Sequence, residues 1–202
     1  MKKILLSNII SSLESGSRPK GGVSTTSGDI PSLGAEHLND QGGFNFTNLK
    51  LIPHNFYKSL KKGRLKPNDI LIVKDGATTG KVSFVNEHFP HTDAAINEHL
   101  FRVEIDKRKA DPSFVFRFLN SGLGQHQILK DFRGATVGGI SRGFIEKVDI
   151  PYPSITEQKR IAAILDKADA IRRRRQQAIQ LSDELLKRGG KKFVSEMFVN
   201  PV

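Results

Sequence analysis

A glycine-flanked turn that ends in a lysine is the segment whose residue types most invite chemistry. Gly76-Ala-Thr-Thr-Gly80-Lys81 combines glycines, hydroxyls and an ammonium group, as do loops that cradle phosphate. Its spacing is one residue shorter than that of the nucleotide-binding loop G-x-x-x-x-G-K-[ST], and Val82 stands where that loop has a magnesium-binding hydroxyl. We therefore expect no nucleotide hydrolysis at this turn, whereas a close approach of its backbone to the phosphate of a nucleic acid stays open.

The other residue types that support catalysis do not form a recognisable set. His88, His91 and Asp93 are the one loose metal-binding group, and no second ligand pair accompanies them, which favours a surface loop. The chain has no cysteine, which excludes thiolate zinc sites and cysteine nucleophiles. A G-x-S-x-G elbow, the Pro-Pro-aromatic tetrapeptide of adenine methyltransferases and a nuclease carboxylate cluster are all missing. The sequence thus predicts a binding protein that is not an enzyme and has no cofactor or metal of its own.

Charge is the strongest compositional feature. The chain has 32 Lys and Arg against 21 Asp and Glu, a net charge of +11 in 202 residues. Clustered cations raise the local concentration of phosphate-bearing chains, so this balance favours a polyanionic partner. A basic protein without such a partner is the alternative that charge alone leaves open.

The start of the chain is predicted to be part of the fold. Its apolar run after two lysines is interrupted by Ser7 and Asn8, and Glu14 follows without a small-residue cleavage site. The sequence has no apolar stretch approaching the ~20 residues that a membrane-spanning helix needs. With the lack of cysteine, these features lead us to expect a cytoplasmic protein without a membrane partner.

Residues 1–155 are predicted to form a globular domain of short strands and helices. Strands are expected at 70–73, where Ile-Leu-Ile-Val is flanked by turn residues, at 81–85 as its hairpin partner, at 100–105, and at 145–150. Asp111-Pro112 should open a helix with Phe114, Phe118 and Leu119 on one face, and a second short helix should cover about 123–129.

Residues 156–190 are predicted to form one long helix, followed by a tail at 191–202. Ser154-Ile-Thr-Glu157 has the spacing of a capping box, and Gly189-Gly190 is expected to end the helix. A stripe of mostly apolar or small residues, with one arginine, recurs at alternating steps of three and four, namely Ile161, Ile164, Ala168, Ile171, Arg175, Ala178, Ser182 and Leu185. Leu165 widens this stripe. A helix of about 30 residues is roughly 45 Å long, more than a domain of this size covers, so we expect it to pair with another helix.

The long helix is also basic. Residues 157–193 contain eleven Lys and Arg against five Asp and Glu, a net +6, and Arg172-Arg173-Arg174-Arg175 is the densest charge. One interpretation is a solvated helix surface. The other is that at least one of these arginines lies near the apolar seam, where it bridges to an acidic group on a partner.

The order of these motifs resembles the specificity subunit of type I restriction-modification enzymes. Leu65-Lys-Pro-Asn-Asp-Ile-Leu-Ile-Val-Lys-Asp-Gly76 is similar to the strand entry of the family's target recognition domain. Asn97-Glu-His-Leu-Phe-Arg-Val103 is similar to its following strand. Most specific are Gly134-Ala-Thr-Val-Gly-Gly-Ile-Ser-Arg-Gly-Phe-Ile145 and Ile150-Pro-Tyr-Pro-Ser-Ile-Thr-Glu-Gln-Lys-Arg-Ile-Ala162, which resemble the junction between that domain and the conserved helix.

The resemblance implies a function and a fold. It implies an α+β protein, in which a mixed-sheet recognition domain is followed by one long helix that pairs as an antiparallel coiled coil. Family members usually hold two recognition domains and two helices, whereas this chain has one of each. Two half-subunits would then pair into a homodimer that recognises two inverted half-sites in double-stranded DNA. By resemblance, a methyltransferase (modification) subunit and a motor-nuclease restriction subunit are the protein partners. The target bases and the spacer length are not readable from the sequence.

The residues expected to contact DNA are polar groups in predicted loops. First are Lys74, Thr78, Thr79 and Lys81, because a glycine-flanked hairpin lets the backbone approach DNA closely. The remaining candidates are Arg142, Ser141, Arg133, Arg18, Lys20 and Arg64.

Three other functions stay in competition. A non-enzymatic adaptor, whose helix docks a protein partner, predicts no sequence-selective DNA binding. An RNA-binding module suits the charge but lacks an evident platform of interleaved aromatic residues. A small nuclease or methyltransferase lacks its motif residues.

Overall fold

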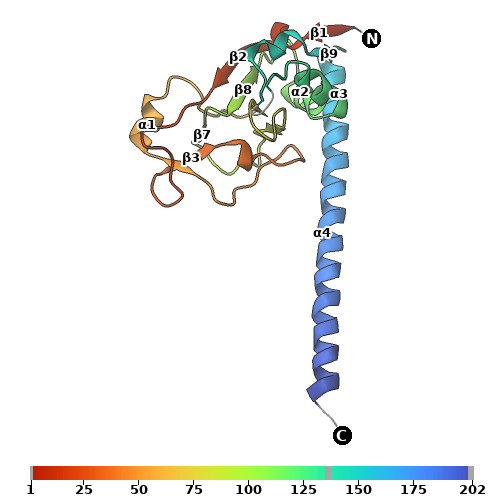
Figure 1. The fold of residues 1–202 in the computed structure, drawn as a ribbon. Coiled ribbons are helices and arrows are strands. Elements are labelled where there is room, and N and C mark those ends of the chain that lie inside the picture. Colours follow the sequence, from red (N-terminus) through yellow and green to blue (C-terminus); the bar gives the residue numbers. More distant parts are fainter. Residues whose placement is uncertain (1, 135–137, 200–202) are drawn as a thin grey trace. The chain divides into compact units, whose positions relative to one another are not determined.

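The computed structural model describes residues 2–134 and 138–199, with side chains up to Lys187. The chain divides into two compact units, residues 1–160 and residues 161–202, which are described separately. Figure 1 shows the first unit as strands and short helices and the second as a single helix.

A four-stranded antiparallel sheet lies at the centre of the first unit. It contains β2 (Ile10–Ser15), β8 (Leu100–Ile105), β5 (Ile70–Val73) and β6 (Val82–Phe84), in the order β2-β8-β5-β6. All four residues of β5 are fully buried, as expected for a short continuous apolar run. The predicted strands at 70–73, 81–85 and 100–105 and the hairpin between the first two are confirmed.

Two smaller sheets complete the strand arrangement. In one, β3 (Ile30–Leu33) pairs antiparallel with β4 (Leu51–Ile52) and parallel with β7 (Ala95–Ile96). In the other, β1 (Lys3–Leu5) pairs antiparallel with β9 (Asp149–Pro151). The fold is therefore α+β with a mixed sheet, as expected, and the start of the chain is the first element of the fold.

The prediction of a strand at 145–150 is wrong over most of that range. Residues Arg142–Glu146 form a 3-10 helix, η3, and the strand β9 begins only at Asp149. Ser141 caps η3, because its Oγ accepts a hydrogen bond from Gly143 N (3.1 Å). The helical turn buries Phe144 against the ring of Phe101, with ring centroids 5.8 Å apart, and this packing outweighs the apolar alternation that favoured a strand.

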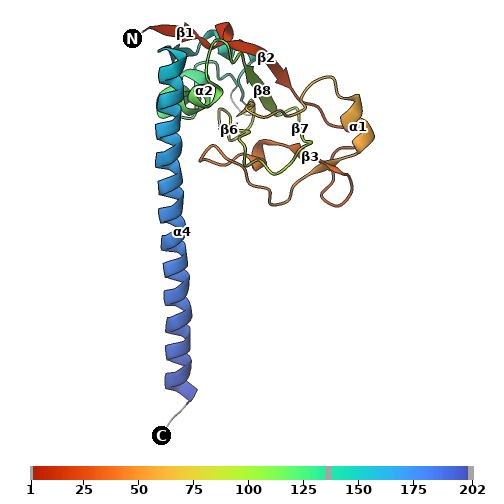
Figure 2. The same ribbon diagram turned by 180° about the vertical axis from the view of Figure 1, so that it is seen from behind.

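The short helices lie at different sides of the first unit (Figure 2). They are α1 (His54–Ser59), α2 (Pro112–Leu119) and α3 (Gly122–Leu129), with 3-10 turns η1 (Leu6–Asn8) and η2 (Ala35–His37). Asp111 caps α2 by accepting a hydrogen bond from Phe114 N (2.9 Å), which confirms the predicted helix start. Phe114 and Leu119 are buried as expected, and Phe116 stacks on Phe84 of β6.

A buried ion network crosses the central sheet. Arg102 on β8 is 1 % exposed, and it binds Asp69 (Nε–Oδ2, 2.5 Å), Glu14 (2.8 Å) and Glu104 (2.7 Å). Asp69 directly precedes β5, Glu14 lies on β2, and Glu104 lies on β8 itself. A buried guanidinium needs several such partners, so the network fixes how the strands pair.

The long helix α4 spans Ile155–Val199. Its start is confirmed, because Ser154 Oγ accepts from Glu157 N (3.3 Å). The expected stop at Gly189-Gly190 and the tail beginning at 191 are wrong, since the helix continues through both glycines. Each glycine costs a helix only about 1 kcal/mol relative to alanine, which does not by itself end a helix. Within the described residues, none of the helices has the length and apolarity to cross a bilayer.

Candidate nucleic-acid interface

The turn between β5 and β6 carries the four residues that the sequence placed first. Thr78 is exposed, and Thr79 Oγ1 donates to the carbonyl oxygen of Gly76 (2.7 Å). The ammonium group of Lys74 lies 5.9 Å from the centre of the Phe101 ring, and that of Lys81 pairs with Asp40 Oδ1 at 2.7 Å. Hydrogen bonds from Gly80 N to Val73 O and from Lys81 N to Thr78 O close the turn. Thr78, Thr79 and Lys81 line one hollow beside the turn, whereas the Lys74 side chain lies over Phe101.

A second loop is attached to this turn by backbone hydrogen bonds. Gly76 N donates to Gly138 O (3.1 Å), and Ile140 N donates to Lys74 O (2.7 Å). A Cβ atom at Gly139 would lie only 2.6 Å from Lys74 O, so the close approach requires glycine there. The segments around 76 and 139, which are far apart in the sequence, thus form one surface. Residues 135–137, within the quoted junction motif, lie outside the described residues.

The buried carboxylate of Asp131 holds the second loop in place. Its carboxylate accepts hydrogen bonds from Ser141 N (2.7 Å) and Ser141 Oγ (2.6 Å), and it pairs with Lys147 (2.5 Å). Burial opposes ionisation, but the hydrogen bonds from Lys147 and Ser141 hold the pKa of Asp131 below its ordinary value. Ser141 is thereby committed to holding the loop. Arg133 on the same loop also pairs with Asp131 (Nη2–Oδ1, 3.7 Å), and its side chain is 75 % exposed.

Arg142 is occupied by a structural contact. Its Nη2 donates to the carbonyl oxygen of Leu13 on β2 (2.5 Å). The contact ties the start of η3 to the edge of the central sheet. Among the sequence candidates, Arg142 and Ser141 thus have structural partners in the DNA-free protein.

A polar cluster next to the turn was missed by sequence reasoning, except for Arg18. His99 directly precedes β8, and its Nδ1 lies 2.5 Å from Asp75 Oδ1 while its Nε2 lies 2.9 Å from Arg18 Nη2. Arg18 also pairs with Glu98, and this hydrogen bond holds the pKa of Glu98 below its ordinary value although burial acts in the opposite direction. The signal in the sequence is weak, because these residues are far apart along the chain.

The last two residues predicted to contact DNA, Lys20 and Arg64, lie in different parts of the first unit. Lys20 is exposed on the segment that also carries Arg18. Arg64 lies elsewhere, since its guanidinium stacks over the ring of Tyr57 (4.9 Å to the centroid) and donates to Lys58 O (2.5 Å). The fold therefore gathers Arg18, Lys74, Thr78, Thr79 and Arg133 around the end of β5, and it commits Arg64 to packing on α1.

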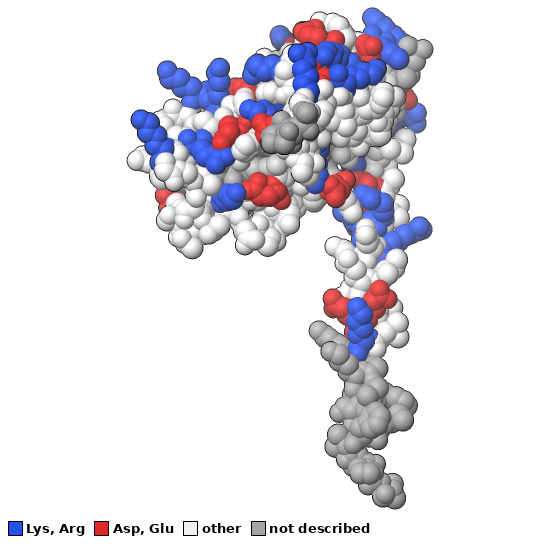
Figure 3. All heavy atoms as spheres, viewed as in Figure 1, with Lys and Arg blue, Asp and Glu red and all other residues white. Residues whose placement is uncertain are grey.

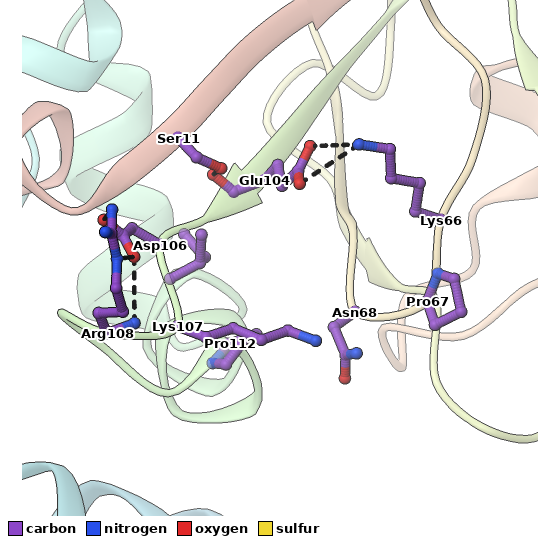
Figure 4. Close-up of a pocket in the computed structure, with 10 residues that line it drawn as sticks. Ser11, Lys66, Pro67, Asn68, Glu104, Asp106, Lys107, Arg108 and Pro112 are labelled. Atoms are coloured by element: carbon purple, nitrogen blue, oxygen red, sulfur yellow. Dashed lines mark hydrogen bonds and ion pairs between the residues drawn. The ribbon is translucent and has the colours of Figure 1, made fainter.

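Two hollows lie at opposite ends of β5. The first, about 450 Å³, is beside the turn, and it is lined by Asp40, Thr78, Thr79, Lys81, Val82, Asn120 and Gln125. The second, about 600 Å³, is lined by Ser11, Lys66, Pro67, Asn68, Glu104, Ile105, Asp106, Lys107, Arg108 and Pro112. Figure 4 shows the second one, with Lys66 paired to Glu104, Arg108 paired to Asp106, and Lys107 pointing toward Asn68. Its hydroxyl, Ser11 Oγ, donates to the backbone oxygen of Glu104, so no nucleophile is activated there.

The histidines of the 88–93 segment do not form a metal site. His91 packs edge-on against Phe46 and Phe89, and Asp93 accepts a hydrogen bond from Tyr57 Oη (3.0 Å). Among the side chains that the structure describes, up to Lys187, no group of three or more His, Cys, Asp or Glu is placed to hold a metal ion.

The charge on the first unit is mixed but predominantly basic. Residues 1–160 contain 23 Lys and Arg against 16 Asp and Glu, a net +7. Figure 3 shows the cations of one face interspersed with carboxylates, rather than gathered in a single positive stripe. Such a surface attracts a polyanion and also offers hydrogen-bond acceptors to it.

The described part of the second unit leaves an apolar helix face in solvent. Ile164 is 51 % exposed, Ile171 53 % and Leu185 68 %. Ala168, Ile171 and Arg175 border one shallow hollow on the helix, which places these three predicted seam residues on a common face. Arg172 pairs with Asp169 on the same helix (3.2 Å). Exposed apolar rows of this length are usual where a partner helix binds.

The sequence profile of one family, described as the type I restriction modification DNA specificity domain, matches residues 2–181. The chain belongs to this family. The match covers all the strands, the junction and α4 as far as residue 181.

Curated specificity subunits are similar to this chain over 138 residues. The specificity subunit of the type I restriction enzyme StySPI from Salmonella potsdam is 25 % identical to it, and that of EcoKI from Escherichia coli K12 is 26 % identical. In both cases the aligned region is 68 % of this chain and 29 % of the relative. The chain therefore matches less than a third of the length of these relatives.

Solved structures show the same fold. A chain described under "Structural basis underlying complex assembly and conformational transition of the type I R-M system" superposes with a TM-score of 0.61 at 19 % identity, covering 96 % of this chain and 42 % of that one. The S subunit of a type I restriction-modification system from M. genitalium superposes with a TM-score of 0.58 at 18 % identity, covering 84 % and 39 %.

Proposed function

We propose that this specificity domain is a sequence-specific DNA-recognition subunit without a catalytic centre, which directs a methyltransferase subunit, and in restriction a motor-nuclease subunit, to its target. The observation that carries the proposal is the family match over residues 2–181. The curated relatives are named as specificity subunits of type I restriction enzymes, which supports the same role here.

The surface at the end of β5 is the part of the molecule best suited to contact DNA. Lys74, Lys81 and Arg133 provide cations for phosphate oxygens, which fix position and give salt-dependent affinity. Thr78 and the Arg18–His99 cluster provide donors and acceptors for base edges. Backbone hydrogen bonds between the 74–76 and 138–140 segments hold Lys74 and Arg133 on neighbouring loops, and Arg18 and His99 adjoin them through Asp75, which favours a defined register on the duplex.

The helix supports a second part of the proposal, a homodimer. Its exposed apolar row would pair with that of a second chain in an antiparallel coiled coil. Two recognition domains would then face two inverted half-sites separated by a non-specific spacer. A seam of roughly 45 Å exceeds one turn of DNA, ~34 Å, and is long enough to separate two half-sites.

Selection from a randomised duplex library tests the proposed function. The purified full chain, alone and together with a type I modification subunit, is incubated with the library, and the retained duplexes are sequenced. We expect an enriched motif made of two inverted half-sites, and methylation in the presence of the modification subunit within that motif.

Two results would contradict the proposal. Retention of duplexes without any enriched sequence, in both samples, would remove the recognition role and leave a general DNA binder. Binding to the modification subunit without any retention of DNA would favour the adaptor function.

A further inference from the structure

Arg18, Asp75, Glu98 and His99 form one polar cluster, and the role given to it here rests on the proposed function. Arg18 Nη2 can only donate, so at 2.9 Å it makes His99 Nε2 the acceptor. The proton of the neutral ring then lies on Nδ1 and is donated to Asp75 Oδ1 at 2.5 Å. Asp75 therefore fixes the tautomer of His99, as second partners of histidine commonly do.

The cluster differs from a phosphate site in its charge. With His99 neutral, the cations Arg18 and Lys74 are balanced by Asp75 and Glu98, which all lie within one connected set of contacts. A phosphate site carries a net positive charge and donors only, because phosphate oxygens only accept. A neutral set that combines donors with an acceptor matches the edge of a base pair better.

The order of donors and acceptors singles out one base pair. The Nη1 end of Arg18 has no hydrogen-bond partner among the described residues, so the row Nη1, Nη2 of Arg18 and Nε2 of His99 runs donor, donor, acceptor. In the major groove, a guanine–cytosine pair presents N7 and O6 of guanine as acceptors and then N4 of cytosine as a donor. An adenine–thymine pair presents acceptor, donor, acceptor, which this row does not complement.

We propose that Arg18 and His99 together read one guanine–cytosine pair in each half-site, and that Asp75 is the positioning residue that keeps His99 an acceptor. On binding, Arg18 transfers a hydrogen bond from His99 Nε2 to guanine, and cytosine N4 donates to the vacated nitrogen. The Glu98 carboxylate keeps the guanidinium oriented during this exchange. Each hydrogen bond that Arg18 and His99 lose is replaced by one to the base pair, which keeps the exchange inexpensive.

Asp75→Asn tests the positioning role. Oδ2 of Asp75 faces the ammonium group of Lys74 at 3.7 Å, so the asparagine carbonyl oxygen should take that side and turn its NH2 group toward His99. The proton of His99 then moves to Nε2, which becomes a donor. We expect nitrogen NMR of the DNA-free chain to show an Nδ1-protonated ring in the wild type and an Nε2-protonated ring in Asp75→Asn.

Library selection tests the reading role. Arg18→Lys keeps the charge but loses the two-pronged donor. Arg18→Lys and Asp75→Asn should each lower the preference for guanine–cytosine at one position of each half-site by about 5- to 150-fold, with the other positions unchanged. Lys20→Ala, an exposed cation on the same segment, should weaken binding to all sequences without changing the motif.

The outcomes separate the two proposals. If the wild type enriches no motif, the proposed function itself fails. If the wild type enriches a motif and both variants keep it at every position, with affinity reduced evenly, the cluster contacts phosphate and the inference is wrong. Thermal unfolding of each variant near the wild-type temperature excludes loss of the fold as the cause.

Discussion

At the scale of single residues, Lys81 is the lysine of the turn whose ammonium group forms a close ion pair, with Asp40 at 2.7 Å. The Lys81 side chain is 21 % exposed and that of its partner Asp40 is 87 % exposed, so a DNA phosphate can replace that carboxylate at little cost. Lys81→Ala should weaken binding to all DNA sequences alike and reduce the slope of log affinity against log salt by about one unit. Fluorescence anisotropy over a series of salt concentrations measures the slope.

Lys107 provides the matched control for this measurement. It lies on the hollow at the other end of β5, away from the turn (Figure 4). Lys107→Ala should leave the slope unchanged. An equal reduction for both variants would show that the salt dependence reports overall charge and would remove Lys81 from the interface.

Asp69 gives the folded state an unusual dependence on pH. Burial raises the pKa of its carboxyl to about 6, against the opposing hydrogen bond from Arg102. The folded state therefore binds a proton between pH 6 and 4 that the unfolded chain does not, so this residue adds stability as the pH falls through that window.

Asp69→Asn should remove this contribution. The free energy of unfolding of the wild type relative to the variant should increase by up to about 3 kcal/mol from pH 7 to pH 4. Urea unfolding at several pH values measures it. In Asp106→Asn the difference should stay flat over the same window, because Arg108 lowers the pKa of Asp106 to about 2. A flat difference for Asp69→Asn would show that its carboxyl remains ionised.

At the scale of elements, Gln158 locks the start of α4 onto the globular unit. Its side chain is fully buried, with Oε1 accepting from Asp111 N (2.9 Å) and Nε2 donating to Pro153 O (2.9 Å). Gln158→Ala should destabilise the unit by about 1–3 kcal/mol, because it leaves a buried N–H and a carbonyl without partners. Urea unfolding checks this, and the exposed neighbour Lys159, changed to Ala, should stay within about 0.5 kcal/mol of the wild type.

Ala168→Pro tests the long helix as a spacer. Proline removes a hydrogen bond and clashes within the preceding turn, at a cost of about 3 kcal/mol or more. We expect loss of assembly with a second chain and with the modification subunit, while the thermal transition of the globular unit is retained. Ala168→Ser keeps the helix and should assemble as the wild type does. Assembly of the proline variant would rule out the spacer role.

At the scale of the whole molecule, the unpaired apolar face of α4 predicts a dimer. Sedimentation at increasing concentration should show two chains of 22.4 kDa per particle. Ile171→Glu, which places a charge in the seam, should return the protein to a monomer, whereas Arg173→Glu two residues further on should not. A monomer at high concentration for the wild type would contradict the dimer and, with it, the symmetric target site.

The extent of sequence-based prediction differed between the two units. Strands β5 and β8 were predictable because a continuous or alternating apolar run and flanking turn residues are local features. The start of α4 was predictable for the same reason, since a capping box and a proline boundary act within a few residues. The end of α4 was not predictable, because a pair of glycines lowers the stability of a helix only slightly and the helix continues through it.

At the glycine-flanked turn 76–81, some features of the candidate site follow from the sequence and others follow only from the tertiary structure. The sequence by itself determined the turn, the basic character of the chain, the apolar row of the helix and the family, because each depends on residue types at short spacing. Only the tertiary structure brought Arg18 and His99 to Asp75 and committed Ser141, Arg142 and Arg64 to internal contacts. Pairing of distant strand ends decides which polar side chains meet, and hydrogen-bond partners separated by tens of residues leave no periodic pattern along the chain.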